Sequence, residues 1–487
     1  KVVNFSDAEI NKFSTASLIT RTTNDVQQVQ MVTVMLLRMV LYAPIMAVGG
    51  IIMVIRTGAG MGYIIAIAVA AIAVLMILLM AFAMPKFKIM QKLVDKVNLV
   101  SREILTGIPV IRAFSREKHE EKRFDDANKE LTGVMLYTNR VMTFMMPALM
   151  IIMNVMSILI VWTSAHRIDA GVMEVGTMTA FITYTMMIVM AFLMLTMISI
   201  MLPRAGVAAD RIDEVLKTEV SVNNSTDAVD AGRSKGVVRF NHVSFAYPEA
   251  DGKVLDDIDF EASPGTTTAI IGSTGCGKST LVNLIPRFFD VTEGSITLDG
   301  RDIRNITLES LRENIGYVPQ KGILFSGTIA DNIKYGQLAE SDEDMLEAAE
   351  IAQATEFIEA KPDKYESRVA QGGNNVSGGQ KQRLSIARAI ARDPMIYIFD
   401  DSFSALDFKT DAALRKALAP KVKDKTVLIV AQRISTVMHA EQIIVLDDGK
   451  VAGIGTHKEL MENCEIYRQI AGSQLSESEL KKSLEVK

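Results

Sequence analysis

The residues with the clearest chemical potential form a glycine-rich loop between two apolar segments. The run 267–271 has the composition of a buried strand, and the segment 281–288 follows with helical periodicity. The loop between them consists of Gly272, Ser273, Thr274, Gly275, Cys276, Gly277, Lys278, Ser279 and Thr280. This G-x-x-x-x-G-K-S spacing between a strand and a helix is the P-loop pattern. Its glycines let backbone N–H groups converge on phosphate oxygens at a helix N-terminus, where the helix dipole favours negative charge.

Nearby side chains supply the charges that a phosphate site needs. Lys278 would reach the outer phosphates of a nucleotide, and the Ser279 hydroxyl is a ligand for Mg²⁺. The apolar run 395–399 ends in Asp400 and Asp401. A carboxylate at the end of a buried strand beside a P-loop is typical of the Mg²⁺ partner of the phosphates. We therefore predict Asp400 in that role, with Asp401 where a water-activating base would lie.

A second anion site is predicted at the start of another helix, which runs to about residue 391. Ser377 and Gln380 have the spacing of a capping box, which is the structural interpretation. The intervening Gly378 and Gly379 also expose backbone N–H groups at a helix start, which favours an anion. Both interpretations remain open from the residues alone.

The part of the chain before these motifs resembles a membrane protein in composition. The 487 residues are 49% hydrophobic and 22% charged, and all but four of the 29 Met residues precede residue 220. Four apolar runs, at 31–55, 63–84, 141–165 and 178–202, are each long enough to cross a bilayer. We predict four transmembrane helices in a lipid bilayer. The net charge of −5 gives no indication of a nucleic-acid partner.

A basic segment between the second and third apolar runs sets the predicted topology. Because the other two connectors are short and nearly uncharged, the excess of Lys and Arg places this segment in the cytosol. Apolar residues at helical spacing over 93–105 predict that the membrane helices extend into the cytosol. Gly107 and Pro109 are expected to end that pattern before a short helix at 110–114.

Two features of the apolar runs allow both a functional and an ordinary interpretation. Arg38 interrupts the first run, so it faces either a cavity or the headgroup level of the membrane. The many Met residues provide a deformable surface that would suit varied apolar substrates, although lipid-facing filler is the simpler interpretation for most of them.

The second half of the chain has the pattern of an α/β domain. Short β-rich runs from residue 237 onward alternate with helical segments. The predicted fold is an all-α transmembrane bundle followed by an α/β P-loop nucleotide-binding domain. The boundaries are 1–215 for the transmembrane domain, 216–235 for a linker, 236–475 for the nucleotide-binding domain and 476–487 for a polar tail.

The two cysteines, Cys276 and Cys464, cannot build a disulfide framework, which favours a reducing compartment. Cys276 is either a reactive thiol or, more simply, filler.

Taken together, these motifs resemble the nucleotide-binding domain of an ATP-binding cassette (ABC) transporter. Lys278, Gln320, the 377–380 segment and Asp400 occur in the order found in that family. With the preceding helices, the chain resembles an exporter-type half-transporter of the multidrug or lipid kind. Six helices precede the cassette in that family, so two helices are expected upstream of this sequence. The segments 4–26 and 107–114 resemble the family's two coupling helices.

The resemblance implies roles for individual residues. Tyr247 matches the aromatic residue that stacks on adenine, with an ordinary strand-end Tyr as the alternative. Gln320 matches the glutamine that senses Mg²⁺ and the γ-phosphate. Ser377, Gly378, Gly379 and Gln380 would contact the ATP bound to the opposite subunit, because two cassettes close head to tail around two ATP molecules.

Several departures from the family pattern affect catalysis. Asp401 stands where active members have Glu, Gln432 where they have a switch His, and Gln371 where they have Glu before the signature. The signature itself is intact apart from Val376 in the usual Leu position. The resemblance therefore implies a degenerate-site subunit of a heterodimer, in which Asp401, Gln432 and Gln320 support only weak hydrolysis of ATP with Mg²⁺.

The predicted function is ATP-driven export of hydrophobic or amphipathic solutes across the cytoplasmic membrane, with the nucleotide-binding domain in the cytosol. The predicted partner is a second half-transporter. One alternative is a nucleotide-gated regulatory or channel-like subunit, and another is a lipid or peptide exporter, which would share every cassette residue.

Overall fold

The computed structural model describes the chain except for residues 58–59, 249, 338–340, 477, 481–482 and 484–487. Only the backbone is described at 80, 84, 88, 195–200 and 203–204. The chain forms two compact units, residues 19–214 and residues 1–18 together with 215–487. The predicted tail 476–487 lies largely outside the described residues.

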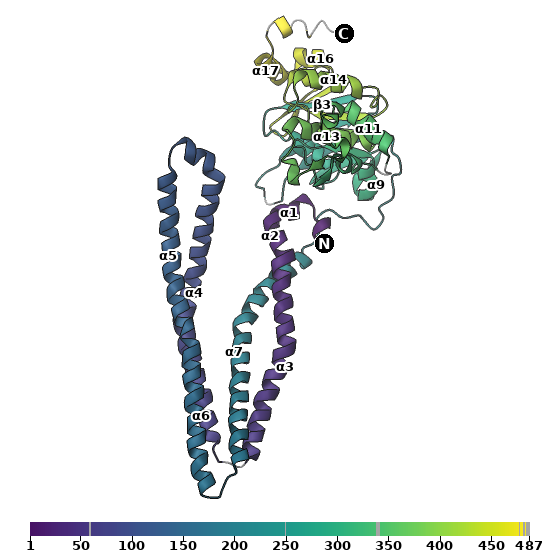
Figure 1. Ribbon diagram of the computed structural model, residues 1–487. Coiled ribbons are helices and arrows are strands. Elements are labelled where there is room, and N and C mark those ends of the chain that lie inside the picture. The colour runs from purple at the N-terminus through teal and green to yellow at the C-terminus, as the bar shows by residue number, and fades with distance from the viewer. Residues whose placement is uncertain (58–59, 249, 338–340, 477, 481–482, 484–487) are drawn as a thin grey trace. The chain divides into compact units, whose positions relative to one another are not determined.

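The first unit is helical. Its helices are α2 (Thr15–Thr20, shared between the units), a π-helical turn at Arg21–Asp25, α3 (Val26–Arg56), α4 (Gly62–Ala113), α5 (Glu117–Thr143), α6 (Met145–Asp169) and α7 (Val175–Lys217) (Figure 1). Within the described residues, four helical stretches are long and apolar enough to span a membrane: Thr15–Arg56, Gly62–Ala113, Glu117–Asp169 and Val175–Met194. The prediction of four transmembrane helices is confirmed.

The helix α4 is much longer than a bilayer requires. The apolar residues at helical spacing over 93–105 predict such an extension. The predicted break at Gly107 and Pro109 is wrong, because α4 continues to Ala113. Pro109 removes only one N–H from the helical hydrogen bonds, and the neighbouring turns maintain the helix around it. The chain reverses instead at Ser115, whose φ of +51° ends the helix before α5 begins.

One apolar cluster joins α3, α4, α6 and α7. Its buried members are Val54, Met61, Ile64, Ile65, Ala68, Met156, Ile160, Phe181 and Ile188. Gly50 of α3 allows close approach to α7, since a Cβ at that position would lie 2.7 Å from Ile188 Cγ1. A side chain at the adjacent Gly49 would meet nothing within 4 Å.

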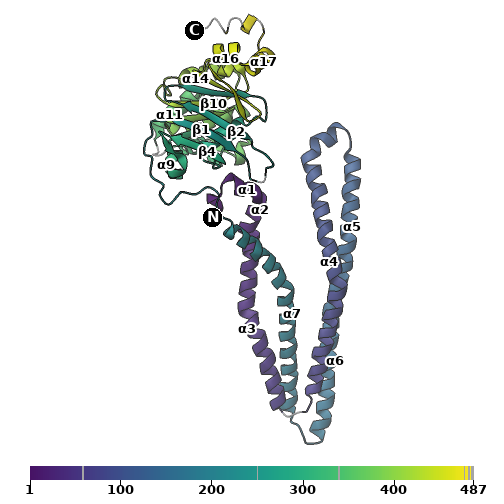
Figure 2. The same cartoon turned by 180° about the vertical axis from the view of Figure 1, so that it is seen from behind.

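The second unit contains a six-stranded sheet in the order β12-β11-β3-β10-β9-β6. Strand β10 of this sheet is labelled in Figure 2, together with β1, β2 and β4 of a smaller sheet. The strands of the six-stranded sheet are β3 (Thr267–Gly272), β6 (Ile315–Val318), β9 (Ile396–Asp400), β10 (Thr426–Val430), β11 (Gln442–Asp447) and β12 (Lys450–Gly455). All neighbours are parallel except β11 and β12. The carboxyl ends of β3 and β9 therefore lie on the same edge, on either side of β10.

Smaller sheets and helices cover the six-stranded sheet. A four-stranded antiparallel sheet contains β1 (Val238–Phe245), β2 (Leu255–Ala262), β4 (Glu293–Leu298) and β5 (Arg301–Asp302), and β7 (Gly327–Thr328) pairs with β8 (Arg368–Val369). The helices are α8 (Lys278–Leu284), α9 (Leu308–Glu313), α10 (Ile329–Lys334), α11 (Asp342–Ile351), α12 (Thr355–Glu359), α13 (Gly378–Ala391), α14 (Phe408–Leu418), α15 (Ile434–Val437), α16 (His457–Asn463) and α17 (Glu465–Gln474). Short 3-10 turns occur at Val2–Asn4, Ile303–Asn305, Lys364–Glu366 and Gln371–Gly373.

The central strands are buried on both faces, as expected for parallel strands between two layers. Ile398 and Leu428 belong to the core that faces the four-stranded sheet and α8. Phe399 and Ile429, one residue further along each strand, belong to the core beneath α11 and α13. This alternation holds the strand ends rigidly at the edge where the P-loop begins.

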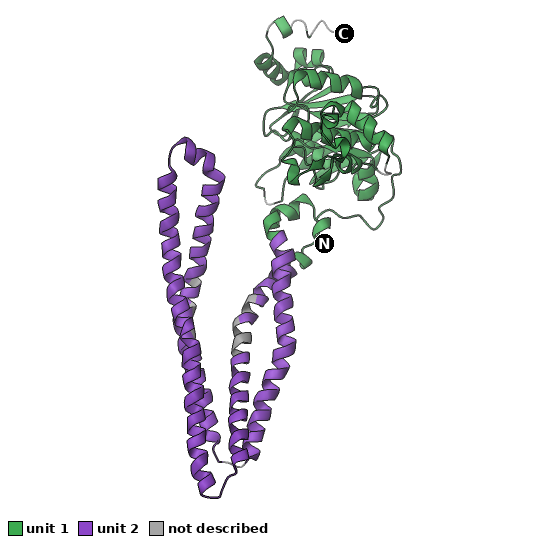
Figure 3. Ribbon diagram, in the orientation of Figure 1, with its two compact units in different colours: residues 1–18, 215–487 green, residues 19–214 purple. Residues whose placement is uncertain are grey.

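The N-terminal segment groups with the nucleotide-binding part (Figure 3). Its helix α1 (Asp7–Phe13) starts with a capping box formed by Ser6 and Glu9. Ser6 Oγ lies 2.8 Å from Ser221 Oγ, and Ser221 N donates to Glu9 Oε1 at 3.1 Å. The predicted linker is thus tied to α1 at one end.

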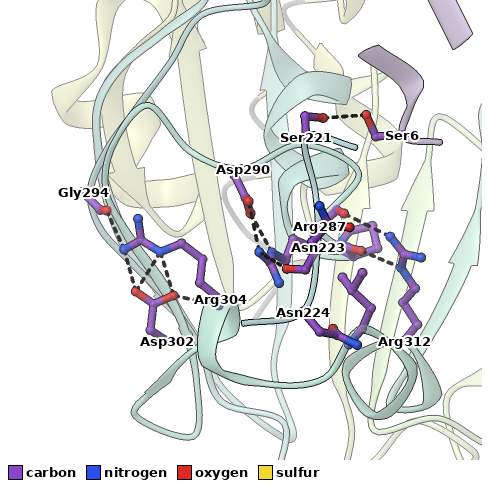
Figure 4. Close-up of polar contacts among 12 residues, drawn as sticks. Ser6, Ser221, Asn223, Asn224, Arg287, Asp290, Gly294, Asp302, Arg304 and Arg312 are labelled. Atoms are coloured by element: carbon purple, nitrogen blue, oxygen red, sulfur yellow. Dashed lines mark hydrogen bonds and ion pairs between the residues drawn. The ribbon is translucent and has the colours of Figure 1, made fainter. Parts of the chain in front are cut away.

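The predicted linker is also tied to the nucleotide-binding domain (Figure 4). Arg287 Nη2 donates to the carbonyl oxygen of Asn223 at 3.0 Å, and Asn224 Oδ1 accepts from Leu308 N at 2.8 Å. Arg287 lies just after α8, so the linker is anchored close to the helix that follows the P-loop. The predicted domain boundaries remain predictions.

Candidate nucleotide-binding site

The site begins where β3 runs into the P-loop. The Lys278 ammonium is buried and donates to the carbonyl oxygens of Gly272 at 2.9 Å and Ser273 at 2.6 Å. These bonds fold the loop around the lysine. Ser273, Thr274 and Gly275 are exposed, so this part of the loop is accessible to a ligand.

Two P-loop glycines are required by close backbone packing. A Cβ at Gly272 would lie 2.1 Å from the carbonyl oxygen of Leu446. Gly277 has a φ of +97° and is the N-cap of α8, and a Cβ there would lie 2.8 Å from Leu255 Cδ2. The loop can therefore place its N–H groups over the helix N-terminus only with glycine at these positions.

Ser279 and Asp400 meet at the predicted metal position. Ser279 Oγ donates to Asp400 Oδ1 at 3.0 Å, and Asp400 is buried. Burial raises the pKa of Asp400, the hydrogen bond from Ser279 opposes that shift, and the neighbouring Asp401 adds to it. A buried carboxylate that resists ionisation gains from a cation placed beside it.

The oxygen atoms of this pair fit Mg²⁺. A hydroxyl and a carboxylate are hard ligands, and Mg²⁺ usually combines one or two of them with substrate phosphates rather than binding in a cage of protein ligands. The described part of the chain has no group of three or more His, Cys, Asp or Glu side chains that could hold a metal.

The three predicted catalytic side chains form one cluster. Asp401 Oδ2 accepts hydrogen bonds from Gln432 Nε2 at 2.9 Å and from Gln320 Nε2 at 3.3 Å. Asp401 has a φ of +46°, and its backbone N–H donates to the carbonyl oxygen of Val430 at 3.0 Å. Three separate segments therefore converge on a single carboxylate oxygen.

Two residues that support this cluster were missed by the sequence reasoning. Ser402 Oγ donates to the carbonyl oxygen of Val318 at 3.1 Å, which ties the end of β9 to the end of β6 two residues before Gln320. The side chain of Gln474 in α17 donates to the carbonyl oxygen of Gln432 and accepts from Ile434 N, both at 2.8 Å. Neither contact follows a short sequence pattern.

Tyr247 lies beside the helix that follows the P-loop. Its hydroxyl is 2.9 Å from Thr280 Oγ1. Its ring meets Phe245 and Phe289 edge-on, at centroid distances of 5.0 Å and 5.2 Å. The phenol is thus fixed next to the P-loop helix, while its stacking on adenine remains a prediction. Cys276 is buried in the core beneath the loop, and its Sγ lies 3.6 Å from Lys278 Nζ.

The 377–380 segment forms the predicted capping box at the start of α13. Ser377 N donates to Gln380 Oε1 at 3.1 Å, and Gln380 N donates to Ser377 Oγ at 3.3 Å. A Cβ at Gly378 would meet nothing within 4 Å, so the helix tip is open. Among the described residues, no hydrogen bond connects this tip with the P-loop of the same chain.

Comparisons with known proteins agree with both halves of the chain. The ABC transporter family model matches residues 255–404, and the model for the ABC transporter transmembrane region matches residues 1–192. An uncharacterized ABC transporter ATP-binding protein of Mycobacterium tuberculosis is 44% identical over 97% of this chain and 82% of its own length. The uncharacterized ABC transporter ATP-binding protein YfiB of Bacillus subtilis is 40% identical, with the same coverage of both chains.

A solved structure gives the same result for the fold. The structure of a bacterial Atm1-family ABC exporter with ATP bound superimposes with a TM-score of 0.82 at 26% sequence identity, covering 98% of this chain and 83% of that one. The chain is therefore a multi-pass membrane protein of the ABC transporter family, in which a transmembrane region and an ATP-binding domain have the fold of an exporter.

Proposed function

We propose that this chain is the weakly hydrolysing subunit of a heterodimeric ATP-driven exporter. The observation that carries the proposal is the Asp401 carboxylate, whose Oδ2 accepts from both Gln432 and Gln320. Because both amide groups occupy Oδ2, an attacking water must approach the carboxylate at Oδ1 or displace one of the glutamines.

The residue types point in the same direction. Asp is one methylene shorter than Glu, so its carboxylate stands roughly 1 Å further from a water at the γ-phosphate, a displacement that can cost about 100-fold in rate. The Gln432 amide can donate a hydrogen bond but cannot become cationic, whereas an imidazole can. Binding of ATP should persist while its cleavage at this P-loop is slow.

The residues that would hold the nucleotide are intact. Lys278 and the P-loop N–H groups would bind the phosphates, and Tyr247 would stack on adenine. Ser279, Asp400 and Gln320 would hold Mg²⁺, which when bound neutralises charge on the phosphates. These residues bind and orient ATP, and none of them depends on Asp401 acting as a base.

The open tip of α13 supports a contribution to a second, active site. Gly378 and Gly379 present backbone N–H groups that no P-loop residue of this chain uses, while the Ser377 N–H donates to Gln380 Oε1 in the capping box. In a head-to-tail dimer this tip would cover ATP bound to the partner subunit. A partner with its own Glu and His would then provide the hydrolysis that drives export, and this requirement favours a heterodimer.

The solute that we propose is apolar or amphipathic and comes from the cytosolic side. The membrane helices expose flexible Met side chains such as Met146, Met150 and Met190, which adapt to varied apolar shapes.

The alternative function, a nucleotide-gated subunit that binds ATP without pumping, would need the same nucleotide contacts. ATP-dependent accumulation of solute in inside-out vesicles separates the two, because a gate alone cannot concentrate a solute.

Restoration of the two altered side chains tests the proposal. In the subunit purified without a partner, the double variant Asp401→Glu with Gln432→His should raise the rate of ATP hydrolysis about 10- to 100-fold, because a longer base and a cationic switch are both supplied. The matched control is Asp424→Glu, which makes the same change at an exposed position of the same domain. Failure of the double variant to exceed this control would remove Asp401 and Gln432 as the cause of slow hydrolysis.

A further inference from the structure

Every charged residue in the apolar membrane segments is basic. The segments 26–94, 131–168 and 175–209 contain no Asp or Glu. Their charged residues are Arg38, Arg56, Lys86, Lys88, Lys92, Arg140, Arg167 and Arg204. A cationic solute would therefore find no carboxylate in these segments, whereas an anionic solute would find several partners.

One of these cations, Arg140, lines a groove, and a second, Lys86, contacts another residue of its lining, Tyr137. A groove of about 520 Å³ runs between α4 and the junction of α5 with α6. Its apolar walls consist of Leu75, Leu78, Leu79, Phe82, Val141 and Phe144. Phe82 is 59% exposed and Phe144 is 63% exposed, so the walls are open to an occupant. The stretch 75–82 covers roughly 10 Å of helix, which is long enough for a short alkyl tail.

The groove ends in polar groups from both helices. Tyr137 and Arg140 of α5 line it. Lys86 follows Phe82 by one turn on the same face of α4, and its Nζ lies 5.5 Å from the centre of the Tyr137 ring. Within the described residues, neither Lys86 nor Arg140 forms an ion pair with a carboxylate. Both cations are thus available at the same end of one apolar surface.

Basic residues at the ends of membrane helices also serve as ordinary headgroup anchors. An anchor of that kind needs neither a groove nor a second cation from a neighbouring helix. Here a guanidinium, an ammonium and a phenol from two helices surround the end of an open apolar wall. Guanidinium groups bind carboxylate and phosphate oxygens in a bidentate manner, which gives the pair a preference for anionic headgroups.

We propose that this groove binds anionic amphiphiles with a single tail as solutes for export. The tail would lie along the walls at 75–82 and 141–144, and a carboxylate, sulfate or phosphate would lie at Arg140 and Lys86. The inference rests on the proposed export function, because it names the chemical class of the exported solute.

Binding is measured first, without nucleotide, on the whole transporter in nanodiscs of uncharged phosphatidylcholine. The probes are dansylamino-undecanoate, its uncharged amide and a trimethylammonium analogue with the same tail. The anion should bind at least about tenfold more tightly than either analogue, because only the anion forms charge-assisted hydrogen bonds with Arg140 and Lys86. Equal affinities for the three probes would contradict the proposal.

Variants at Arg140 test whether this side chain determines the preference for the anionic probe. Arg140→Gln should weaken binding of the anion about tenfold and leave the amide unchanged, while Arg140→Glu should shift the preference to the trimethylammonium probe. The matched control is Lys92→Gln, which removes an exposed charge on α4 outside the groove. A structural defect would weaken all three probes together, so the absence of a reversal in Arg140→Glu would overturn the proposal.

Two further measurements distinguish a resident lipid in the groove from a solute, and binding of the solute from its export. Phosphatidylglycerol added to the nanodiscs should leave probe binding largely intact, and complete loss of binding would assign the groove to a resident lipid and contradict the proposal. In inside-out vesicles the anionic probe should accumulate with ATP. If no probe accumulates although the binding preference persists, the proposed export function fails while the charge selectivity of the groove stands.

Discussion

At the scale of single residues, the Asp401 carboxylate joins the strand that ends in Asp400 to two distant glutamines. Its backbone is fixed by the bond to Val430, and its Oδ2 accepts from Gln432 and Gln320. This arrangement stabilises the carboxylate where it stands. The same hydrogen bonds compete with any water that would use Asp401 as a base, so stability and catalysis are opposed at this atom.

The support beneath this cluster can be tested at Ser402. Ser402→Ala should lower the free energy of unfolding by about 1 kcal/mol, because a buried hydroxyl loses its bond to the Val318 carbonyl. The matched control is Ser326→Ala, which removes a hydroxyl at an exposed position of the same domain. The measurement is chemical denaturation followed by the fluorescence of the ATP-binding domain. Equal, small losses for both variants would show that Ser402 does not fix the end of β9.

The residues of the P-loop could be predicted because their chemistry lies in consecutive positions beside a strand. In the structure Ser279 donates to Asp400, and Lys278 binds the carbonyl oxygen of Gly272 within the loop. Gln474 could not be predicted, because it lies 42 residues after Gln432 and contacts its backbone only through the packing of α17. A side chain that binds the backbone of a residue far away in the sequence produces no recognisable pattern among its neighbouring residues.

At the scale of elements, length and periodicity allowed some predictions and misled others. The four membrane helices are determined by long apolar runs, and α4 continues through Pro109 because one missing N–H is a small loss in a helix of 52 residues. The strand β2 was missed because acidic residues interrupt its apolar alternation, and Asp257 within it has a φ of +55°. Its partner β1 shows register shifts at the same place.

The packing of α3 on α7 gives a test with adjacent positions. Gly50→Leu should lower the midpoint of thermal denaturation of the transporter by several degrees, because its side chain would displace Ile188. Gly49→Leu should leave the midpoint unchanged or raise it slightly, since its side chain meets open space and Leu favours a helix more than Gly. Equal shifts for the two variants would contradict the close approach of the helices.

The C-terminal helices give the domain a dependence on pH. His457 in α16 is buried, and its ring nitrogens lie 2.8 Å from the Tyr467 hydroxyl and 2.9 Å from Ser483 Oγ. Burial lowers the pKa of His457 from 6.5, with a smaller effect from His439. The unfolded chain therefore binds a proton that the folded domain resists. The stabilisation is complete above pH 6.5 and is lost as the pH falls from there through the lowered folded pKa.

Thermal denaturation from about pH 8 to about pH 5 tests this effect. The slope of stability with pH should become smaller in His457→Gln. His242→Gln is the control, because the pH dependence of His242 has the opposite sign. The hydrogen bond to Asp257 raises the pKa of the exposed His242 imidazole. Its contribution to stability is therefore lost as the pH rises through that raised pKa. An unchanged slope in His457→Gln would exclude this histidine as the cause.

At the scale of the whole molecule, function depends on surfaces that one chain does not complete. The P-loop and the tip of α13 belong to the same domain, yet no hydrogen bond joins them among the described residues. The family could be predicted from the sequence because its motifs are local and ordered. The solute could not, because the proposed groove is lined by side chains of α4 and of the junction of α5 with α6, and nothing in their spacing along the chain shows that they meet.

The most direct test is the turnover of ATP by the unmodified subunit purified without a partner. Nucleotide binding and hydrolysis are measured on the same preparation. The proposal predicts about one tightly bound ATP for each chain, with hydrolysis on the order of 100-fold slower than after addition of a partner subunit that has Glu and His at the corresponding positions. Rapid turnover by the unmodified subunit alone would contradict it.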